Sequence, residues 1–175
     1  MHIGLLVTNT DDSDFAARHP RDAEKFTALM AGVRPGWDVT AFDLPKGDFP
    51  EGIQGFDGFV IGGSPASVRD DTAWIARLMG LIREAYAAGI PLVGACFGHQ
   101  AIAQALGGKV GHSPGAFVLG AAETTLTAPA VWMDGPGVIR LAAAHGEQVT
   151  ALPPRAEVIG TAPGCPVAAY RIGDA

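Results

Sequence analysis

Cys96 is the residue of this chain whose surroundings point most directly to covalent chemistry. It lies within the stretch GACFGHQ at 94–100, after an apolar run at 90–93 and before a helix-like run at 101–106. A cysteine between glycines at a strand-to-helix turn is typical of a nucleophile elbow, because the glycines allow close backbone approach and the turn raises the side chain above the sheet. We expect the N-terminus of the following helix to lower the pKa of the thiol. A buried structural cysteine is the alternative, but it would not require glycines on both sides.

The loop Gly-Gly-Ser-Pro at 62–65 is a second candidate for the same site. It follows the apolar run at 59–61, and ligands of open α/β sheets bind at the carboxyl ends of the strands. The backbone N–H of Gly63 or Ser64, together with that of Phe97, would then form an oxyanion hole beside Cys96. Taken alone, the loop is equally typical of a simple turn before a helix.

Composition limits the class of protein. The 175 residues are 48% hydrophobic and only 17% charged, which favours one α/β domain over 1–175 with well-covered elements. The net charge of −6 and the lack of a Lys/Arg cluster argue against nucleic acid as a partner. Two cysteines in unrelated contexts suggest reduced thiols and a cytoplasmic protein. The N-terminal apolar run lacks a basic region and is too short to cross a membrane.

Apolar runs alternate with helical patterns in the first part of the chain. This alternation predicts a mostly parallel sheet with helices on both faces, as in flavodoxin-like folds. Asp70 or Asp71 is expected to cap the second long helix. Short segments punctuated by Gly and Pro predict added antiparallel strands in the second half. We expect strands at 3–8, 39–42, 56–61 and 90–94, helices at 21–30, 71–88 and 97–106, and further strands at 121–126, 138–144, 157–161 and 167–171.

These motifs together resemble a known family. GACFGHQ followed by AIAQALGGKV, GSPASV at 63–68, and HGEQV at 145–149 occur in the same order in class I (triad-type) glutamine amidotransferases, especially GMP synthase-like amidotransferase domains. The resemblance implies that Cys96 attacks the side-chain amide of L-glutamine, forms a γ-glutamyl thioester and releases glutamate and ammonia. It places Gln100 at the glutamine pocket and implies no metal or cofactor. A separate synthase subunit would accept the ammonia.

The sequence departs from the family at the catalytic base. Family members take the base and its orienting acid from a His-Pro-Glu segment, which occurs nowhere in this chain. His145, in His-Gly-Glu, has a similar spacing, but its neighbours match a different family segment. A fragment, a pseudoenzyme and a base from a partner chain are the three explanations. If the family's final strand is absent, the edge of a neighbouring strand would be uncovered, which would favour a homodimer.

Two other functions compete with glutamine hydrolysis. One is a catalytically silent binding or regulatory module that retains a glutamine-shaped pocket. The other is a different cysteine-elbow hydrolase of the intracellular-protease-like superfamily, in which a histidine directly follows the cysteine. Phe97 stands at that position here, which weakens this second alternative. The sequence defines neither the ammonia acceptor nor the residue that acts as base.

Overall fold

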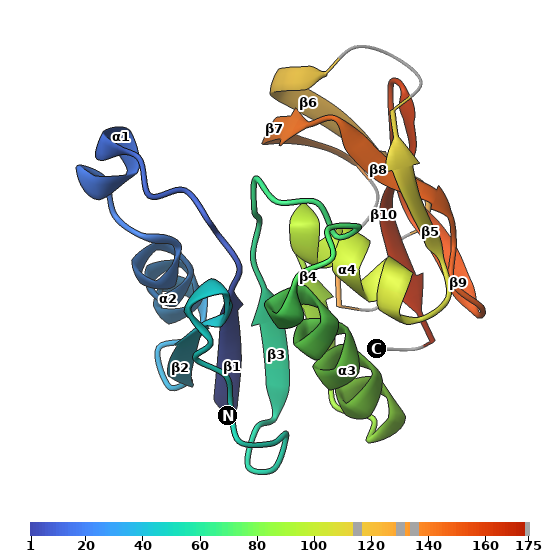
Figure 1. The fold of residues 1–175 in the computed structure, drawn as a ribbon. Helices are drawn as coiled ribbons and strands as arrows, with labels where there is room; N and C mark the ends of the chain where they lie inside the picture. The colour runs from blue at the N-terminus through green and yellow to red at the C-terminus, as the bar shows by residue number, and fades with distance from the viewer. Residues whose placement is uncertain (114–116, 129–131, 134–136, 174–175) are drawn as a thin grey trace. The chain divides into compact units, whose positions relative to one another are not determined.

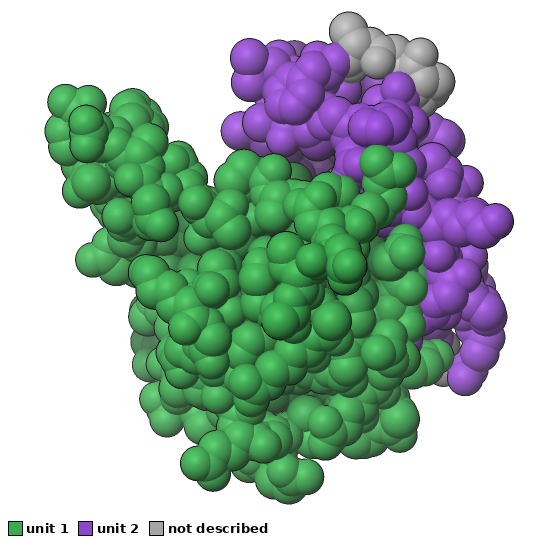
Figure 2. All heavy atoms as spheres, viewed as in Figure 1, with its two compact units in different colours: residues 1–105 green, residues 106–175 purple. Residues whose placement is uncertain are grey.

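The computed structural model describes residues 1–113, 117–128, 132–133 and 137–173. The chain divides into two compact units, residues 1–105 and 106–175 (Figure 2).

The first unit is built on a four-stranded, fully parallel sheet with strand order β2-β1-β3-β4 (Figure 1). The predicted parallel sheet is confirmed, with bounds that differ from the expected ones by one or two residues. The chain moves from β1 outward to β2 and then returns past β1 to β3. The carboxyl ends of β1 and β3 therefore flank a topological switch point, where ligands of such sheets usually bind. The strands are β1 His2–Val7, β2 Asp38–Asp43, β3 Gly58–Ile61 and β4 Leu92–Gly94.

Helices connect these strands as the sequence pattern predicts. The crossover from β1 to β2 and that from β3 to β4 move in opposite directions across the sheet, so right-handed connections place α2 and α3 on opposite faces. Helix α4 follows β4 and packs against both β4 and α3. The helical elements are α1 Asp14–Ala17, α2 Asp22–Val33, the short 3₁₀ helix η1 Leu44–Lys46, α3 Ala73–Ala87 and α4 Phe97–Ala105.

Helix α3 has one apolar stripe, and its start differs from the prediction. Leu78, Ile82 and Ala85 are completely buried at helical spacing, as an amphipathic helix requires. The predicted cap at Asp70 or Asp71 is wrong, because Thr72 occupies the N-cap position and makes no side-chain capping bond. The carboxylate of Asp70 instead accepts the N–H of Ser67 at 2.9 Å.

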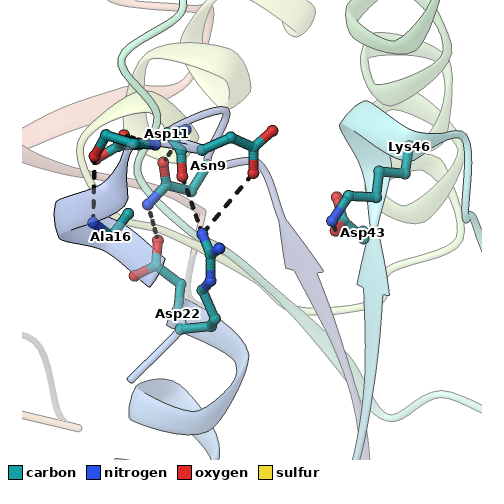
Figure 3. A network of polar contacts seen from close by, with 9 residues as sticks. Asn9, Asp11, Ala16, Asp22, Asp43 and Lys46 are labelled. Atoms are coloured by element: carbon teal, nitrogen blue, oxygen red, sulfur yellow. Dashed lines mark hydrogen bonds and ion pairs between the residues drawn. The ribbon is translucent and has the colours of Figure 1, made fainter. Parts of the chain in front are cut away.

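A polar network ties the segment after β1 to the start of α2 (Figure 3). The side-chain amide of Asn9 donates to the carboxylate of Asp22 at 2.9 Å, and the carbonyl of Asn9's side chain accepts the N–H of Asp11 at 2.9 Å. Arg21 donates to the backbone carbonyl of Asp11 at 3.0 Å. These bonds hold the chain where it leaves the carboxyl end of β1.

The second unit consists of antiparallel strands, which confirms the β-rich second half. One sheet has the order β10-β9-β6-β7, and β5 pairs with β8 separately. Strands β5 and β8 were not expected from the sequence. The strands are β5 Lys109–His112, β6 Val118–Leu126, β7 Val138–His145, β8 Glu147–Ala151, β9 Ala156–Ala162 and β10 Cys165–Ile172.

Candidate active site

Cys96 stands in the tight turn between β4 and α4, two residues after the strand ends. Its φ is +53°, a left-handed conformation that costs a non-glycine residue about 1–2 kcal/mol. Such strain at the carboxyl end of a parallel sheet is a feature of nucleophile turns. The residue is accessible to solvent and its thiol is free, although the sulfur is partly desolvated by its surroundings.

The glycines on either side of Cys96 are required by close backbone approach. A Cβ on Gly94 would lie only 2.6 Å from the backbone nitrogen of His99, and one on Gly98 would lie 2.8 Å from the Cβ of Ile61. Two hydrogen bonds hold the turn against β3 and the loop after it: Ala95 N–H donates to Ile61 at 3.0 Å, and Gly98 N–H to Gly62 at 3.0 Å. The turn is therefore fixed by the backbone on both sides of the cysteine.

The loop after β3 lies next to Cys96, as expected from the order of the motifs. A Cβ added to Gly63 would lie 3.6 Å from the Cβ of Cys96, so Gly63 faces Cys96 with room for about a methyl group between them. The Thr8 hydroxyl, just beyond β1, lies 3.1 Å from the carbonyl oxygen of Gly62 and 3.0 Å from that of Gly63. Thr8 is completely buried. This loop is thus held by two neighbouring strands of the sheet.

The backbone N–H groups of Phe97, Gly63 and Ser64 are the expected oxyanion donors, and this role stays a prediction. The backbone N–H of Phe97 points at the thiol of Cys96 closely enough to act on its pKa. Within the described part of the chain, no hydrogen bond engages the backbone N–H of Gly63 or of Ser64. Unengaged N–H groups beside a nucleophile are what an oxyanion hole consists of.

The pKa of the Cys96 thiol is raised, because burial penalises the charged thiolate more than the Phe97 N–H stabilises it. The N–H at the start of α4 does lower this pKa, as predicted, but desolvation outweighs it and the net shift is upward. Because the thiolate is the reactive form, a thiol with a raised pKa calls for a base when it reacts as a nucleophile.

The first residues of α4 are anchored by packing. The ring of Phe97 is 1% exposed and stacks on that of Trp74 from α3, with 5.6 Å between ring centroids. Gln100, predicted at the glutamine pocket, is also buried on α4, and its N–H donates to the carbonyl of Cys96 at 3.1 Å. The placement of Gln100 in a substrate pocket stays a prediction.

His145, the candidate base, is the last residue of β7 in the second unit. Its Nδ1 lies 3.1 Å from the backbone carbonyl of Glu147. Because a carbonyl only accepts, the neutral ring carries its proton on Nδ1 and leaves Nε2 as an acceptor. This is the tautomer that a base requires, and the role of His145 as base stays a prediction.

Other chemistry-bearing groups lie elsewhere. Cys165 is a free, half-buried thiol at the start of β10. In the part of the chain that the structure describes, no three His, Cys, Asp or Glu side chains gather as metal ligands. No helix formed by the described residues has the length and apolar character needed to cross a membrane.

Thr8 is the residue that sequence analysis missed. The sequence pattern places it at the end of the first expected strand, where a hydroxyl at the carboxyl end of a buried strand is the available signal. Its partners lie 54 and 55 residues further along the chain, and only the parallel pairing of β1 with β3 brings them together.

The fold and the position of Cys96 define an α/β protein with a strained cysteine at the carboxyl end of a parallel sheet. The family model "Glutamine amidotransferase class-I" matches residues 31–174. The chain therefore belongs to the class-I glutamine amidotransferase family, and the resemblance noted from its motifs is confirmed.

Individual relatives show two kinds of similarity. Gamma-glutamyl peptidase 4 of Arabidopsis thaliana is 31% identical over 179 residues, covering 97% of this chain and 70% of the peptidase. A glutamine-hydrolysing GMP synthase of Parafrankia is 42% identical over 86 residues, covering 49% of this chain and 16% of the synthase. A glutamine amidotransferase structure from Methylobacillus flagellatus superposes with a TM-score of 0.79 at 26% identity. That superposition covers 98% of this chain and 66% of the solved one.

Proposed function

We propose that this protein cleaves the γ-amide of glutamyl compounds by nucleophilic attack of Cys96, with L-glutamine as the first substrate. The observation that carries the proposal is the left-handed Cys96 between β4 and α4, with Gly63 facing it from the loop after β3. Membership of the class-I glutamine amidotransferase family supports the same substrate.

The proposed reaction has two steps. The sulfur of Cys96 attacks the carboxamide carbon of glutamine, and the oxyanion receives the N–H groups of Phe97 and of Gly63 or Ser64. The C–N bond then breaks, ammonia leaves with the proton taken from the thiol, and a γ-glutamyl thioester remains. Water adds to the thioester, glutamate departs and the thiol is restored. A general base that takes the thiol proton and passes it to the leaving nitrogen typically raises the rate ~10²- to 10⁴-fold. His145 is the candidate for this role.

A second substrate class has its own support. Gamma-glutamyl peptidase 4 matches 97% of this chain, whereas the GMP synthase matches 49%. A γ-glutamyl peptide presents the same γ-carbonyl joined to an amino acid nitrogen in place of ammonia. Attack by Cys96 would form the same thioester and release an amino acid or peptide.

A direct comparison of substrates tests the proposal. Ammonia release from L-glutamine and alanine release from γ-glutamylalanine are measured for the unmodified chain, Cys96→Ala and, as the matched control, Cys165→Ala. We expect release from at least one substrate, lost in Cys96→Ala and retained in Cys165→Ala. Absence of both release and a γ-glutamyl adduct on Cys96 by mass spectrometry would overturn the proposal.

The same assay separates a working enzyme from a silent module. Stoichiometric labelling of Cys96 by a glutamine-analogue electrophile, without sustained product release, would identify a chain that acylates but does not turn over. Sustained hydrolysis that survives His145→Ala would remove His145 from the role of base.

We also propose the partners that the family suggests. A separate synthase subunit would accept ammonia, in line with the similarity to a glutamine-hydrolysing GMP synthase. The two free thiols favour the cytoplasm as the compartment.

A further inference from the structure

Thr8 directly follows β1 at the carboxyl end of the parallel sheet. Its hydroxyl faces the loop after β3, which lies beside Cys96. Its side chain has no exposed surface, and its oxygen lies within hydrogen-bond distance of two successive carbonyl groups, Gly62 at 3.1 Å and Gly63 at 3.0 Å. A hydroxyl has one proton, so it is shared between the two carbonyls or alternates between them. The Gly62–Gly63 and Gly63–Ser64 peptide units are therefore both held by the Thr8 hydroxyl.

Anchoring a carbonyl fixes the N–H of the same peptide unit. In a trans peptide the C=O and the following N–H point in opposite directions. The bond to the Gly62 carbonyl therefore directs the Gly63 N–H away from Thr8, and the bond to the Gly63 carbonyl does the same for the Ser64 N–H. Both N–H groups are without a hydrogen-bond partner among the described residues.

The two peptide units are not anchored equally. The Gly62 carbonyl also accepts the N–H of Gly98 at 3.0 Å, so it keeps one bond if the Thr8 hydroxyl is removed. The Gly63 carbonyl has no second donor among the described residues. The peptide between Gly63 and Ser64 consequently depends on Thr8 alone.

We propose that Thr8 is a positioning residue that aims the Ser64 N–H, and secondarily the Gly63 N–H, at the oxyanion formed when Cys96 attacks a γ-glutamyl carbonyl. This inference rests on the proposed function. Thr8 touches no reacting atom, and it acts by holding the donors in the direction that the transition state needs. A donor that is free to turn toward water stabilises the oxyanion less.

The test compares two reagents that both need the Cys96 sulfur, of which only one passes through an oxyanion. Attack of Cys96 on γ-glutamyl-p-nitroanilide passes through an oxyanion and releases p-nitroaniline in a burst, whereas alkylation by iodoacetamide forms none. We expect Thr8→Val to slow the burst by roughly 10- to 100-fold, somewhat less than the loss of a whole oxyanion donor. The iodoacetamide rate should stay within about twofold, because alkylation forms no oxyanion that the Ser64 and Gly63 N–H groups could stabilise.

Three further variants complete the design. Thr8→Ser keeps the hydroxyl and should restore most of the burst rate. Thr40→Val is the matched control, because it removes a threonine hydroxyl from the adjacent strand β2 whose partner is His2, at 2.9 Å. In a Ser64→Pro background, which lacks the Ser64 N–H, adding Thr8→Val should cause little further loss.

Folding is checked by circular dichroism and by the iodoacetamide reaction itself. Thr8→Ala is the second variant if Thr8→Val does not fold, because the smaller side chain leaves room for a water to hydrate the carbonyls. Water does not fix the direction of the peptides, so the burst should again slow selectively.

The outcomes separate this inference from the proposed function. A burst rate unchanged by Thr8→Val, or an equal fall with both reagents, overturns the positioning role while the proposed function stands. An unmodified chain that reacts with iodoacetamide at Cys96 but never with a γ-glutamyl reagent overturns the proposed function and the positioning role together.

Discussion

Cys96 combines a left-handed backbone with a thiol whose pKa is raised by burial. These two properties act in opposite directions on reactivity. The turn presents the sulfur to a ligand, whereas burial keeps the proton on it. A base that removes the thiol proton would make the sulfur reactive, and His145 is the candidate for that role.

The raised pKa predicts how alkylation of Cys96 depends on pH. Only the thiolate reacts, so the iodoacetamide rate should rise with pH and reach half its maximum above the ordinary thiol value of about 8.5. The measurement uses Cys165→Ser, which leaves Cys96 as the single thiol, with Cys96→Ser as the blank. A rate that is already constant at about pH 7 would show instead that the thiolate is stabilised.

At the scale of the element, the strand-turn-helix around Cys96 depends on two glycines. Gly94 and Gly98 allow α4 to begin directly against β3, and neither position has room for a methyl group. The first residue of α4 is also packed against α3, because the ring of Phe97 stacks on that of Trp74. Backbone approach and ring packing together fix where the cysteine stands.

A pair of glycine substitutions tests this tight approach. Gly98→Ala should lower the free energy of unfolding by about 1–3 kcal/mol or more, because the new methyl group overlaps Ile61. Gly80→Ala, in the interior of α3 with open space around its Cβ, should raise it by about 0.5–1 kcal/mol. Urea unfolding midpoints measure both. Equal effects of the two substitutions would contradict the close approach at Gly98.

The helices, the parallel strands and the turn at Cys96 were predictable from the sequence because they depend on local patterns. The parallel strands, the three long helices and the turn at Cys96 follow from apolar periodicity and glycine placement. The anchoring of the Gly63 carbonyl by Thr8 was not predictable, since it depends on the register of β1 against β3. The larger, opposing effect of desolvation on the thiol's pKa was not predictable for a similar reason, because desolvation depends on packing and not on spacing.

At the scale of the whole molecule, strand β7 raises the question of self-association. It forms one edge of the sheet β10-β9-β6-β7 in the second unit, so one side of its backbone has no strand to pair with in that sheet. Val138, Ile139 and Leu141 on β7 are exposed by 59%, 39% and 58%, respectively. Long apolar edges of this kind favour pairing with another chain.

We expect two copies of the chain to pair through β7. An antiparallel β7–β7 contact brings the same residues of both copies together, as a two-fold symmetric interface requires. Leu141→Lys should shift the dimer toward monomer in sedimentation velocity measured over a range of concentrations, because a lysine on an edge strand opposes pairing. Leu29→Lys, on α2 and also strongly exposed at 64%, is the matched control and should leave the dimer unchanged. A chain that is monomeric at every concentration, or a control that dissociates equally, would show that β7 is not the contact.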